Sequence, residues 1–554
     1  MIPIKFALLW HQHQPDYRTD EEIVLPWVRL HATKDYLEMV QHLERYPTMH
    51  AIINLVPSLI RQIEAYRDGA EDEILQISKK ATASLAEDEK QFLIRNCFNV
   101  NRERMIARSS RYKELWEKQH NNESFDETDL RDLAIHFALA WTGEFSRFES
   151  PFDMLIQKDR DYTEDEKILL FSSLQKIFEK ILPYHKKLLD SGQIEISATP
   201  FYHPILPLLC DTNSAAEAMQ NVLLPQKRFS FPRDAYEQVN RAKILYQERF
   251  DHELQGMWPA EGSISNDALK VLIEENITWT ASDESVLLNS LTHEASGNDD
   301  KKYGEMEKYF PRSFTHGEKN ITIFFRDHGL SDSIGFEYAK WDAYDAAMNF
   351  VNRCKEIREK ILDRFGEDVL KEACICVILD GENCWENYYE NGKYFLDEFY
   401  KALTTTPEIS PVTLSQAIEG IGPRNIRTVS HIVAGSWINA NFKIWIGHAE
   451  KNRAWELLAN AAETFHSFRV IDAESEHHYQ SAYIALLQAE GSDWFWWYGD
   501  DNSSAQKHMF DSIFRSHLVD MYIHLRLPVP HELFENIGHE DVSNGQSGAM
   551  HRAT

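Results

Sequence analysis

Cysteine is scarce in this chain, with six among 554 residues: Cys97, Cys210, Cys354, Cys374, Cys376 and Cys384. No two of them have the CxxC spacing of a zinc knuckle, and their number is low for a disulfide framework. The sequence therefore indicates neither kind of cross-link. Because Cys374 and Cys376 alternate along an apolar run, we expect both to be small buried side chains.

Long hydrophobic runs are also missing. A membrane-spanning helix needs roughly 20 predominantly apolar residues, and no stretch of the sequence reaches that length. The apolar run at residues 4–10 is too short for a typical secretory signal core, and no small-residue cleavage site follows it. We therefore expect a cytoplasmic protein without a membrane partner.

Basic residues are few relative to acidic ones. Lys and Arg number 58 against 88 Asp and Glu, which gives a formal net charge of -30. Like-charge repulsion disfavours binding to nucleic acid or to anionic membranes, so a neutral or small partner is favoured. What the chain does have is 43% hydrophobic and 12% aromatic content, enough to bury one large domain and at least one smaller one.

Short apolar runs rich in β-branched residues recur along the chain and predict strands. They lie at residues 4–10, 50–55, 194–199, 277–282, 321–325 and 374–380, with a weaker candidate at 256–261. Most of these runs are separated by segments with helical periodicity, which favours parallel βα units in an α/β fold. A closed barrel and a doubly wound sheet both fit this pattern.

Two regions depart from the alternation. Residues of about 60–190 predict an almost wholly helical insertion, with one helix start at Thr163, where Glu166 completes a capping box, and an end near Gly192. Strand-like runs also fade after 400–430. We predict a catalytic domain at 1–405, a helical C-terminal domain at 406–540 and a polar tail at 541–554.

Polar and aromatic residues cluster where the predicted strands end. The segments are HQHQPDY after the first strand, ATPFYHPILP after the third, MWPAEGSIS near the fourth, RDHGLSD after the sixth and DGENCWENYY after the seventh. Ligands of α/β barrels and open α/β sheets bind at the carboxyl ends of the strands. The pattern therefore predicts an active-site rim assembled from several strands.

Two carboxylates on this rim have settings suited to catalysis. Glu261 follows the apolar Trp258, and Gly262 leaves room for the chain to turn. Asp380 ends the apolar run CICVIL, so burial should raise its pKa, and Glu382 could tune it. One ionised and one protonated carboxyl group are what glycosidic-bond cleavage requires. With 88 acidic residues, pairs of this kind also arise by accident, so the residue types alone are a weak signal.

Aromatic residues support a sugar site, because the apolar C–H faces of sugar rings stack on aromatic faces. They are Trp258, Trp385, Tyr388, Tyr389, Trp437, Trp445 and the cluster Trp494 to Tyr498. At least half should simply be core. Trp258 and Trp437 are the best candidates for substrate contact, because both lie inside strand-end motifs.

The opening motif allows a different chemistry. His11 and His13 are two residues apart and would face the same way on a strand, so they could bind a divalent metal with Asp16 or Asp380. Some metal-dependent mannosidases and polysaccharide deacetylases resemble this arrangement. The alternative therefore is a metal-dependent glycosidase or deacetylase.

Five ordered segments resemble the conserved regions of glycoside hydrolase family 57. They are HQHQP (11–15), GQIEISATPFYHP (192–204), GMWPAEGSIS (256–265), VILDGENCWENY (377–388) and AGSWINANFKIWIG (434–447), which together span nearly the whole chain. The forms WPAEGS, LDGENCWE and SWI are most similar to the branch with α-amylase and amylopullulanase members.

This resemblance implies an α/β fold with a (β/α)7 barrel, an incomplete TIM-like barrel, and a helical C-terminal region that helps close the cleft. It implies retaining action on α-glucosidic bonds of starch-like or glycogen-like glucans, with Glu261 as nucleophile and Asp380 as general acid and base, and with no metal or other cofactor. The substrate-binding positions would be His11, His13, Glu195, His203, Trp258, Glu382, Trp437, Asn441 and Asp493.

Activities close to α-amylase remain open at this stage. A 4-α-glucanotransferase and an α-glucan branching enzyme differ from an amylase only in what accepts the glucosyl unit. A glucan-binding protein that has lost turnover is a non-enzymatic alternative, against which the presence of both Glu261 and Asp380 argues.

Overall fold

The computed structural model describes residues 2–538 except residue 21, residues 296–303 and residues 503–505. The predicted tail at 541–554 lies outside these residues. At the centre of the fold are seven parallel strands: β1 (Ile4–Gln12), β2 (Ala51–Leu55), β3 (Ile194–Ser197), β4 (Gly256–Met257), β5 (Trp279–Asp283), β7 (Lys319–Arg326) and β8 (Cys374–Asp380). Each overlaps one predicted run. β4 is shorter than its run, since only its first two residues pair.

The seven strands close into a barrel rather than a doubly wound sheet. Parallel pairing runs from β3 through β2, β1, β8, β7 and β5 to β4. A parallel bridge between Ala198 and Met257 joins β3 to β4 and completes the circle. Every barrel strand thus has a neighbour on both sides, and the predicted (β/α)7 barrel is confirmed.

Alternate side chains of the strands fill the barrel. Ala7 and Leu9 of β1 face inward with Phe324 of β7 and Ile378 of β8, whereas residues of opposite parity such as Leu8 pack outward against helices. Cys374 and Cys376 belong to the inner cluster and are buried, as predicted, and the other four cysteines are buried as well. Helix α19 (Leu414–Ile421) closes the amino-terminal end with Leu414 and Ala417.

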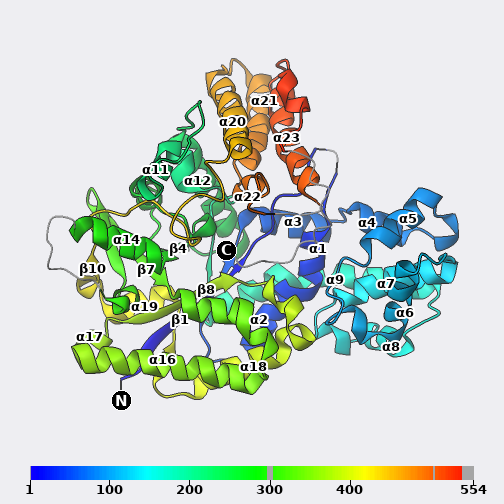
Figure 1. The fold of residues 1–554 in the computed structure, drawn as a ribbon, viewed down its shortest axis with the longest axis horizontal. Helices are drawn as coiled ribbons and strands as arrows, with labels where there is room; N and C mark the ends of the chain where they lie inside the picture. The colour runs from blue at the N-terminus through cyan, green and yellow to red at the C-terminus, as the bar shows by residue number, and fades with distance from the viewer. Residues whose placement is uncertain (1, 21, 296–303, 503–505, 539–554) are drawn as a thin grey trace.

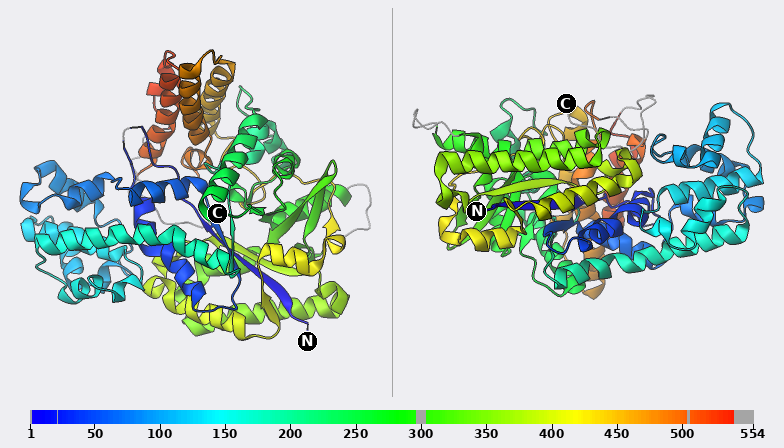
Figure 2. Two further views of the ribbon diagram at one scale, coloured as in Figure 1. Left: turned by 180° about the vertical axis from the view of Figure 1, so that it is seen from behind. Right: turned by 90° about the horizontal axis from the view of Figure 1, so that it is seen from below.

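Helices cover the outside of the barrel (Figures 1 and 2). They are α1 (Trp27–His31), α2 (Leu37–Glu44), α10 (Leu206–Cys210), α11 (Ala215–Ala218), α12 (Pro232–Phe250), α13 (Asn266–Glu274), α14 (Glu284–Ala295), α15 (His328–Asp332), α16 (Ala343–Phe365), α17 (Glu367–Leu370) and α18 (Lys393–Thr405). The sequence patterns missed the antiparallel strand β6 (Arg312–His316), which forms a hairpin with β7.

The chain segment that connects β2 to β3 forms a helical layer, which projects to one side of the barrel, at the right of Figure 1. It consists of α3 (Pro57–Arg67), α4 (Glu73–Lys79), α5 (Glu87–Asn96), α6 (Ser110–His120), α7 (Glu127–Ala140), α8 (Phe152–Lys158) and α9 (Glu164–Asp190). The capping box at the start of α9 is confirmed, because Thr163 and Glu166 exchange side-chain to backbone hydrogen bonds.

After α18 the chain first returns to the sheet. Strand β9 (Ile409–Pro411) pairs with β1, and β10 (Arg427–Thr428) pairs with β6. Only then do α20 (Ala449–Ser467), α21 (Ala473–Ala489), α22 (Ser492–Trp496) and α23 (Lys507–His524) form the bundle at the top of Figure 1. The division into domains at 405/406 stays a prediction.

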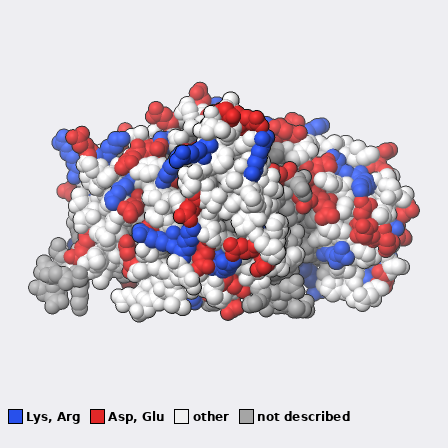
Figure 3. All heavy atoms as spheres, turned by 90° about the horizontal axis from the view of Figure 1, so that it is seen from above, with Lys and Arg blue, Asp and Glu red and all other residues white. Residues whose placement is uncertain are grey.

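The surface carries the charge that the composition implies. Acidic and basic side chains are interspersed over the face shown in Figure 3. Among the described residues, no helix combines the length and the apolar character needed to cross a membrane.

Candidate active site

Inward-facing strand residues become polar at the carboxyl end of the barrel. Along β1 the inward series Ala7 and Leu9 continues to the buried His11, and along β8 the series Cys376 and Ile378 continues to Asp380. The same alternation that packs the core therefore delivers chemically active groups to one end of the barrel.

Glu261 stands just beyond β4 in an unusual backbone conformation. Its φ of 58° and ψ of 24° lie in the left-handed region, which costs a residue with a side chain about 1 kcal/mol or more. The Trp437 backbone N–H donates to the Glu261 carbonyl at 2.8 Å and the Gly262 N–H to the Pro259 carbonyl at 2.9 Å, which holds the turn. A Cβ on Gly262 would come within 2.6 Å of the Trp258 ring, so this position requires glycine.

The carboxyl group of Glu261 faces one strong donor and several negative charges. Trp437 Nε1 donates to its Oε2 at 2.7 Å. Burial raises the pKa of Glu261, the Trp437 hydrogen bond lowers it, and the charges of Asp380 and Asp493 raise it, and together they bring it to about 8. The Asp380 charge thus acts directly on Glu261.

Asp380 is near positive charges, whereas Glu261 is near negative ones. Burial raises its pKa, whereas a hydrogen bond from Asn383 Nδ2 at 3.2 Å and the positive charges of His13 and Arg326 lower it. The charge of Asp380 raises the pKa of Glu261, so the two carboxyl groups interact. With one proton shared between them, burial and neighbouring charge favour holding it on Glu261.

Three histidines form a stack beside the pair. The rings of His13 and His203 are 3.7 Å apart at 14°. His203 Nε2 lies 3.3 Å from His11 Nε2, and His11 Nδ1 lies 2.6 Å from Asn54 Oδ1. Burial lowers the pKa of His11 to about 3 and that of His203 well below its usual range, so both are neutral near pH 7.

The C-terminal bundle supplies one wall of this stack. His13 Nε2 lies 2.9 Å from Asp493 Oδ1, and His203 Nδ1 lies 2.9 Å from Ser492 Oγ, both on or near α22. The aromatic cluster of α22 points elsewhere: Trp494 and Phe495 are buried in the bundle core. Asp493 therefore contacts the histidine stack, whereas the neighbouring Trp494 packs in the core of the bundle.

The structure also tests the metal alternative geometrically. His11 uses both ring nitrogens on Asn54 and His203, and Asp16 pairs with Arg18 at 2.7 Å. Among the residues that the structure describes, the set whose ligand atoms come within 4.8 Å of one another is instead His13, His203 and Asp493. A divalent ion would have to replace the direct His13–Asp493 contact.

Two further predicted residues, Trp258 and Glu382, contact residues of this site. Trp258 is fully buried in the inner barrel cluster, with its ring 5.3 Å from that of Trp437. Glu382 is buried, accepts the His13 backbone N–H at 2.9 Å, and has a pKa raised well above its usual range by burial and by Asp380.

Glu195 is not brought to this end of the barrel. It lies opposite Ile52, in the amino-terminal half, where its carboxylate accepts from Trp279 Nε1 at 2.7 Å and Ser415 Oγ at 2.6 Å. Asn441 lies in the turn after Trp437, where its carbonyl accepts from Ser436 Oγ at 2.6 Å and its side chain accepts the Lys443 N–H at 2.9 Å. The carboxylate of Glu195 therefore serves the fold, and the substrate contacts of both residues stay predictions.

Sequence reasoning missed Asn54, Ser492 and Arg326. Asn54 and Arg326 could have been found by extending the inward parity of their strands from Ile52 and Phe324. Ser492 had no such signal, since it reaches the site from a helix distant in sequence.

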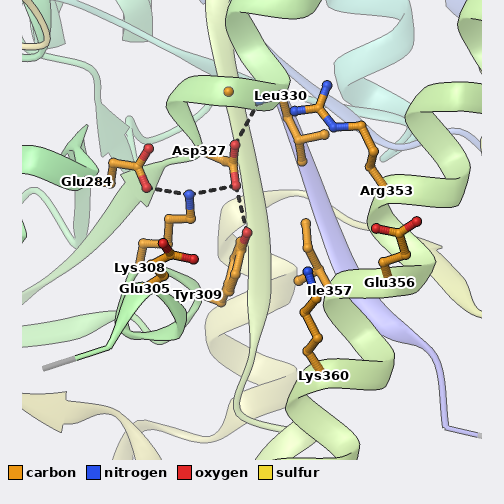
Figure 4. Close-up of a pocket in the computed structure, with 11 residues that line it drawn as sticks. Glu284, Glu305, Lys308, Tyr309, Asp327, Leu330, Arg353, Glu356, Ile357 and Lys360 are labelled. Carbon is orange, nitrogen blue, oxygen red and sulfur yellow. Dashed lines mark hydrogen bonds and ion pairs between the residues drawn. The ribbon is translucent and has the colours of Figure 1, made fainter.

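A cavity of about 420 Å³ lies elsewhere, on the flank between α14, α15 and α16 (Figure 4). Its lining is charged but largely self-paired: Lys308 lies 3.0 Å from Asp327 and also pairs with Glu284, and the Tyr309 hydroxyl donates to Asp327 at 2.7 Å. Size alone does not make it the active site, because the carboxyl pair is not among its lining residues.

A sequence profile described as glycosyl hydrolase family 57 matches residues 7–433. The chain belongs to this family. The family 57 assignment makes it a glycoside hydrolase or transferase and confirms the family resemblance, with four of the five sequence segments inside the matched residues and 434–447 directly after them.

Solved structures share the fold of this family 57 chain. A GH57 branching enzyme from Thermococcus kodakaraensis has a TM-score of 0.62 at 14% identity, covering 94% of this chain and 90% of that one. An α-amylase from Thermotoga maritima has 0.59 at 15%, covering 96% and 95%. A GH57-type branching enzyme from Pyrococcus horikoshii has 0.59 at 14%, covering 99% and 98%. No curated protein sequence matches the chain significantly.

Proposed function

We propose that this family 57 enzyme is a retaining, α-amylase-like glycoside hydrolase acting on α-glucosidic bonds of starch-like or glycogen-like glucans. The observation that carries the proposal is the interacting pair Glu261 and Asp380 at the carboxyl end of the barrel, with Trp437 donating to Glu261. The names of the structural relatives, an α-amylase and two branching enzymes, support an α-glucan as the substrate.

In the first half of the reaction, Asp380 donates its proton to the glycosidic oxygen as the bond from that oxygen to the anomeric carbon breaks. An oxygen of ionised Glu261 attacks the anomeric carbon and forms a covalent glucosyl-enzyme. The reacting state needs the shared proton on Asp380. The Trp437 hydrogen bond favours this state, because it stabilises the ionised form of Glu261.

In the second half, Asp380 accepts a proton from water as the water oxygen attacks the anomeric carbon and releases Glu261. Esterified Glu261 carries no negative charge, so the repulsion that it exerts on ionised Asp380 is gone. The nearby charges of His13 and Arg326 then stabilise Asp380 as the base. Two displacements at one carbon retain its configuration.

Transfer to a sugar hydroxyl is the second candidate. One observation favours it: α22 reaches over the histidine stack through Ser492 and Asp493, and a covered site limits the access of water. A 4-α-glucanotransferase or a branching enzyme would use the same pair of carboxyl groups and a second sugar as acceptor.

Products formed from maltoheptaose and from amylose separate these activities. Hydrolysis predicts shorter sugars and new reducing ends alone. A ladder of products longer than maltoheptaose would establish transfer, and new α-1,6 branch points would establish branching. If the enzyme forms no product from either substrate, the proposal is overturned. The predicted cytoplasmic location is tested by none of these observations and stays a prediction.

A further inference from the structure

Arg326 is a buried cation at the carboxyl end of β7. It is the next inward-facing residue after Phe324, and it pairs in register with Asp283 of β5 and Cys376 of β8. A buried guanidinium is retained at a cost unless its donors are satisfied. Its position therefore calls for an account of what it contacts.

The guanidinium is fixed on three sides. Nε donates to the Ile378 carbonyl at 2.7 Å, and Nη2 donates to Asp332 at 2.7 Å. Nη1 lies 3.4 Å from Asp283 Oδ2. A planar group held by three directional contacts has one orientation, which a flexible lysine could not reproduce.

The Cζ atom of this guanidinium lies over the Trp437 ring, 5.3 Å from its centre. That distance is within the range of a cation–π contact. Trp437 in turn donates from Nε1 to Glu261. Arg326 thus contacts the ring that donates to Glu261, the nucleophile candidate, and can orient that ring.

The same cation acts on the other carboxyl group through its charge. Its positive charge lowers the pKa of Asp380, together with that of His13. Arg326 therefore acts on both members of the pair, on one through Trp437 and on the other through space.

The two carboxylates that pair with Arg326, Asp283 and Asp332, also contact a second basic side chain. His328 of α15 lies 3.4 Å from Asp283 and 2.9 Å from Asp332, and its pKa is raised to about 9 chiefly by its hydrogen bonds to these two carboxylates. Glu284 of α14 accepts the His328 backbone N–H at 3.1 Å. With His328 protonated, two cations face Asp283 and Asp332, so the field of Arg326 at Asp380 is not cancelled by its own partners.

We propose that Arg326 is a positioning residue that orients Trp437 against Glu261 and supplies the fixed positive charge beside Asp380. The inference rests on the proposed function. It concerns residues of the RDHGLSD segment, outside the five segments that carry the family resemblance.

Two substitutions separate the two roles. R326M removes the charge and the ring contact, whereas R326K keeps a charge and loses the fixed orientation. We expect kcat on maltoheptaose to fall about 100-fold for R326M, as for a misplaced catalytic group, with a smaller change in KM. We also expect the acid limb of kcat/KM, which reports Asp380 because the proton is held on Glu261, to move to higher pH in R326M and to stay near its wild-type position in R326K.

R353M is the matched control. Arg353 lies on α16 beside the flank cavity and donates to Ser333 Oγ at 2.6 Å (Figure 4). Its loss should leave kcat and the pH profile as in the wild type. If R326M lowers thermal stability and activity but leaves the acid limb in place, Arg326 is a structural residue only and the inference fails.

A double variant tests the route through Trp437. R326K/W437F should lose no more kcat than W437F alone, because the hydrogen bond from residue 437 to Glu261 is already absent and the charge at position 326 is kept. Additive losses would overturn the inference. A crystal structure of R326M in which Trp437 still donates to Glu261 would overturn it without any assay, whereas a wild-type enzyme inert on both glucans would reject the proposed function instead.

Discussion

Trp437 holds Glu261 at both its backbone and its side chain. The Trp437 backbone N–H donates to the Glu261 carbonyl at 2.8 Å, and the indole Nε1–H donates to the Glu261 carboxylate at 2.7 Å. The segment after β10 therefore fixes a strained residue after β4, and the two segments also meet in a bridge between Ile264 and Gly435. A nucleophile held in this way needs little rearrangement to react.

Replacing Trp437 by Phe should remove the indole donor while keeping an aromatic ring over Trp258. A hydrogen bond to a charged group contributes about 1.5–3 kcal/mol, so we expect kcat/KM at pH 7 to fall roughly 10- to 100-fold. Losing the donor raises the pKa of Glu261, and the alkaline limb of kcat/KM, which reports this group in the free enzyme, should move to higher pH. Initial rates between pH 4 and 10 measure both changes; an unmoved alkaline limb would show that the indole does not act on Glu261.

The pH dependence of stability should also report on Glu261. Its pKa is about 8 in the folded protein and near 4.5 when unfolded, so the folded state binds more protons between these values. Stability from this group is present below pH 4.5 and is lost as pH rises through 8. The Glu261→Gln side chain cannot ionise, so this variant should be more stable than the wild type at pH 8. The expected gain is on the order of 2 kcal/mol, a reduced figure because the group is only partly enclosed. Urea unfolding at pH 4.5 and pH 8 measures it, and an equal gain at both values would contradict it.

Chelation separates the carboxylate mechanism from the metal alternative. If Glu261 and Asp380 carry the reaction, dialysis against EDTA should leave kcat unchanged, and added zinc should not raise it. Zinc in place of the His13–Asp493 contact would use His13, His203 and Asp493 as ligands. Loss of activity with EDTA, its return with zinc, and one bound zinc per chain by elemental analysis would together reject the glycosidase mechanism proposed above.

Glu195 should matter for folding and not for catalysis. Its carboxylate accepts from Trp279 Nε1 and from the backbone and side chain of Ser415, all inside the amino-terminal half of the barrel. Glu195→Gln should lower the free energy of unfolding by about 1–3 kcal/mol and leave kcat within about twofold of wild type. Glu382→Gln, next to Asp380, is the comparison and should lower kcat. A catalytic defect in Glu195→Gln without loss of stability would restore Glu195 to the substrate site.

Much of the fold was predictable because the strands are buried on both faces. Continuous apolar runs marked all seven barrel strands, while β6 was missed because Arg312 and His316 interrupt its apolar character. The depth of a residue in the barrel was harder to predict. Glu195 pairs in register with Ile52, one inward layer below Asn54, and that register depends on packing between strands that are distant in sequence.

Within the site, residues at strand ends were predictable and long-range partners were not. The parity of β1 and β8 places His11 and Asp380. The contact of His13 with Asp493 joins residues 480 positions apart, and only the docking of the bundle on the barrel creates it. The substrate contacts of His13, His203, Glu382 and Asp493 stay predictions.

The most direct test of the central claim is chemical rescue of two alanine variants by azide, with α-maltosyl fluoride as the activated substrate. In Glu261→Ala, azide should occupy the space of the lost nucleophile and give the β-glycosyl azide, with inverted configuration. In Asp380→Ala, the covalent intermediate still forms on Glu261, and azide should give the α-glycosyl azide, with retained configuration. NMR of the anomeric proton distinguishes the two products. This pattern is what the account predicts, and an α-azide from Glu261→Ala together with a β-azide from Asp380→Ala would contradict it by exchanging the roles of the two residues.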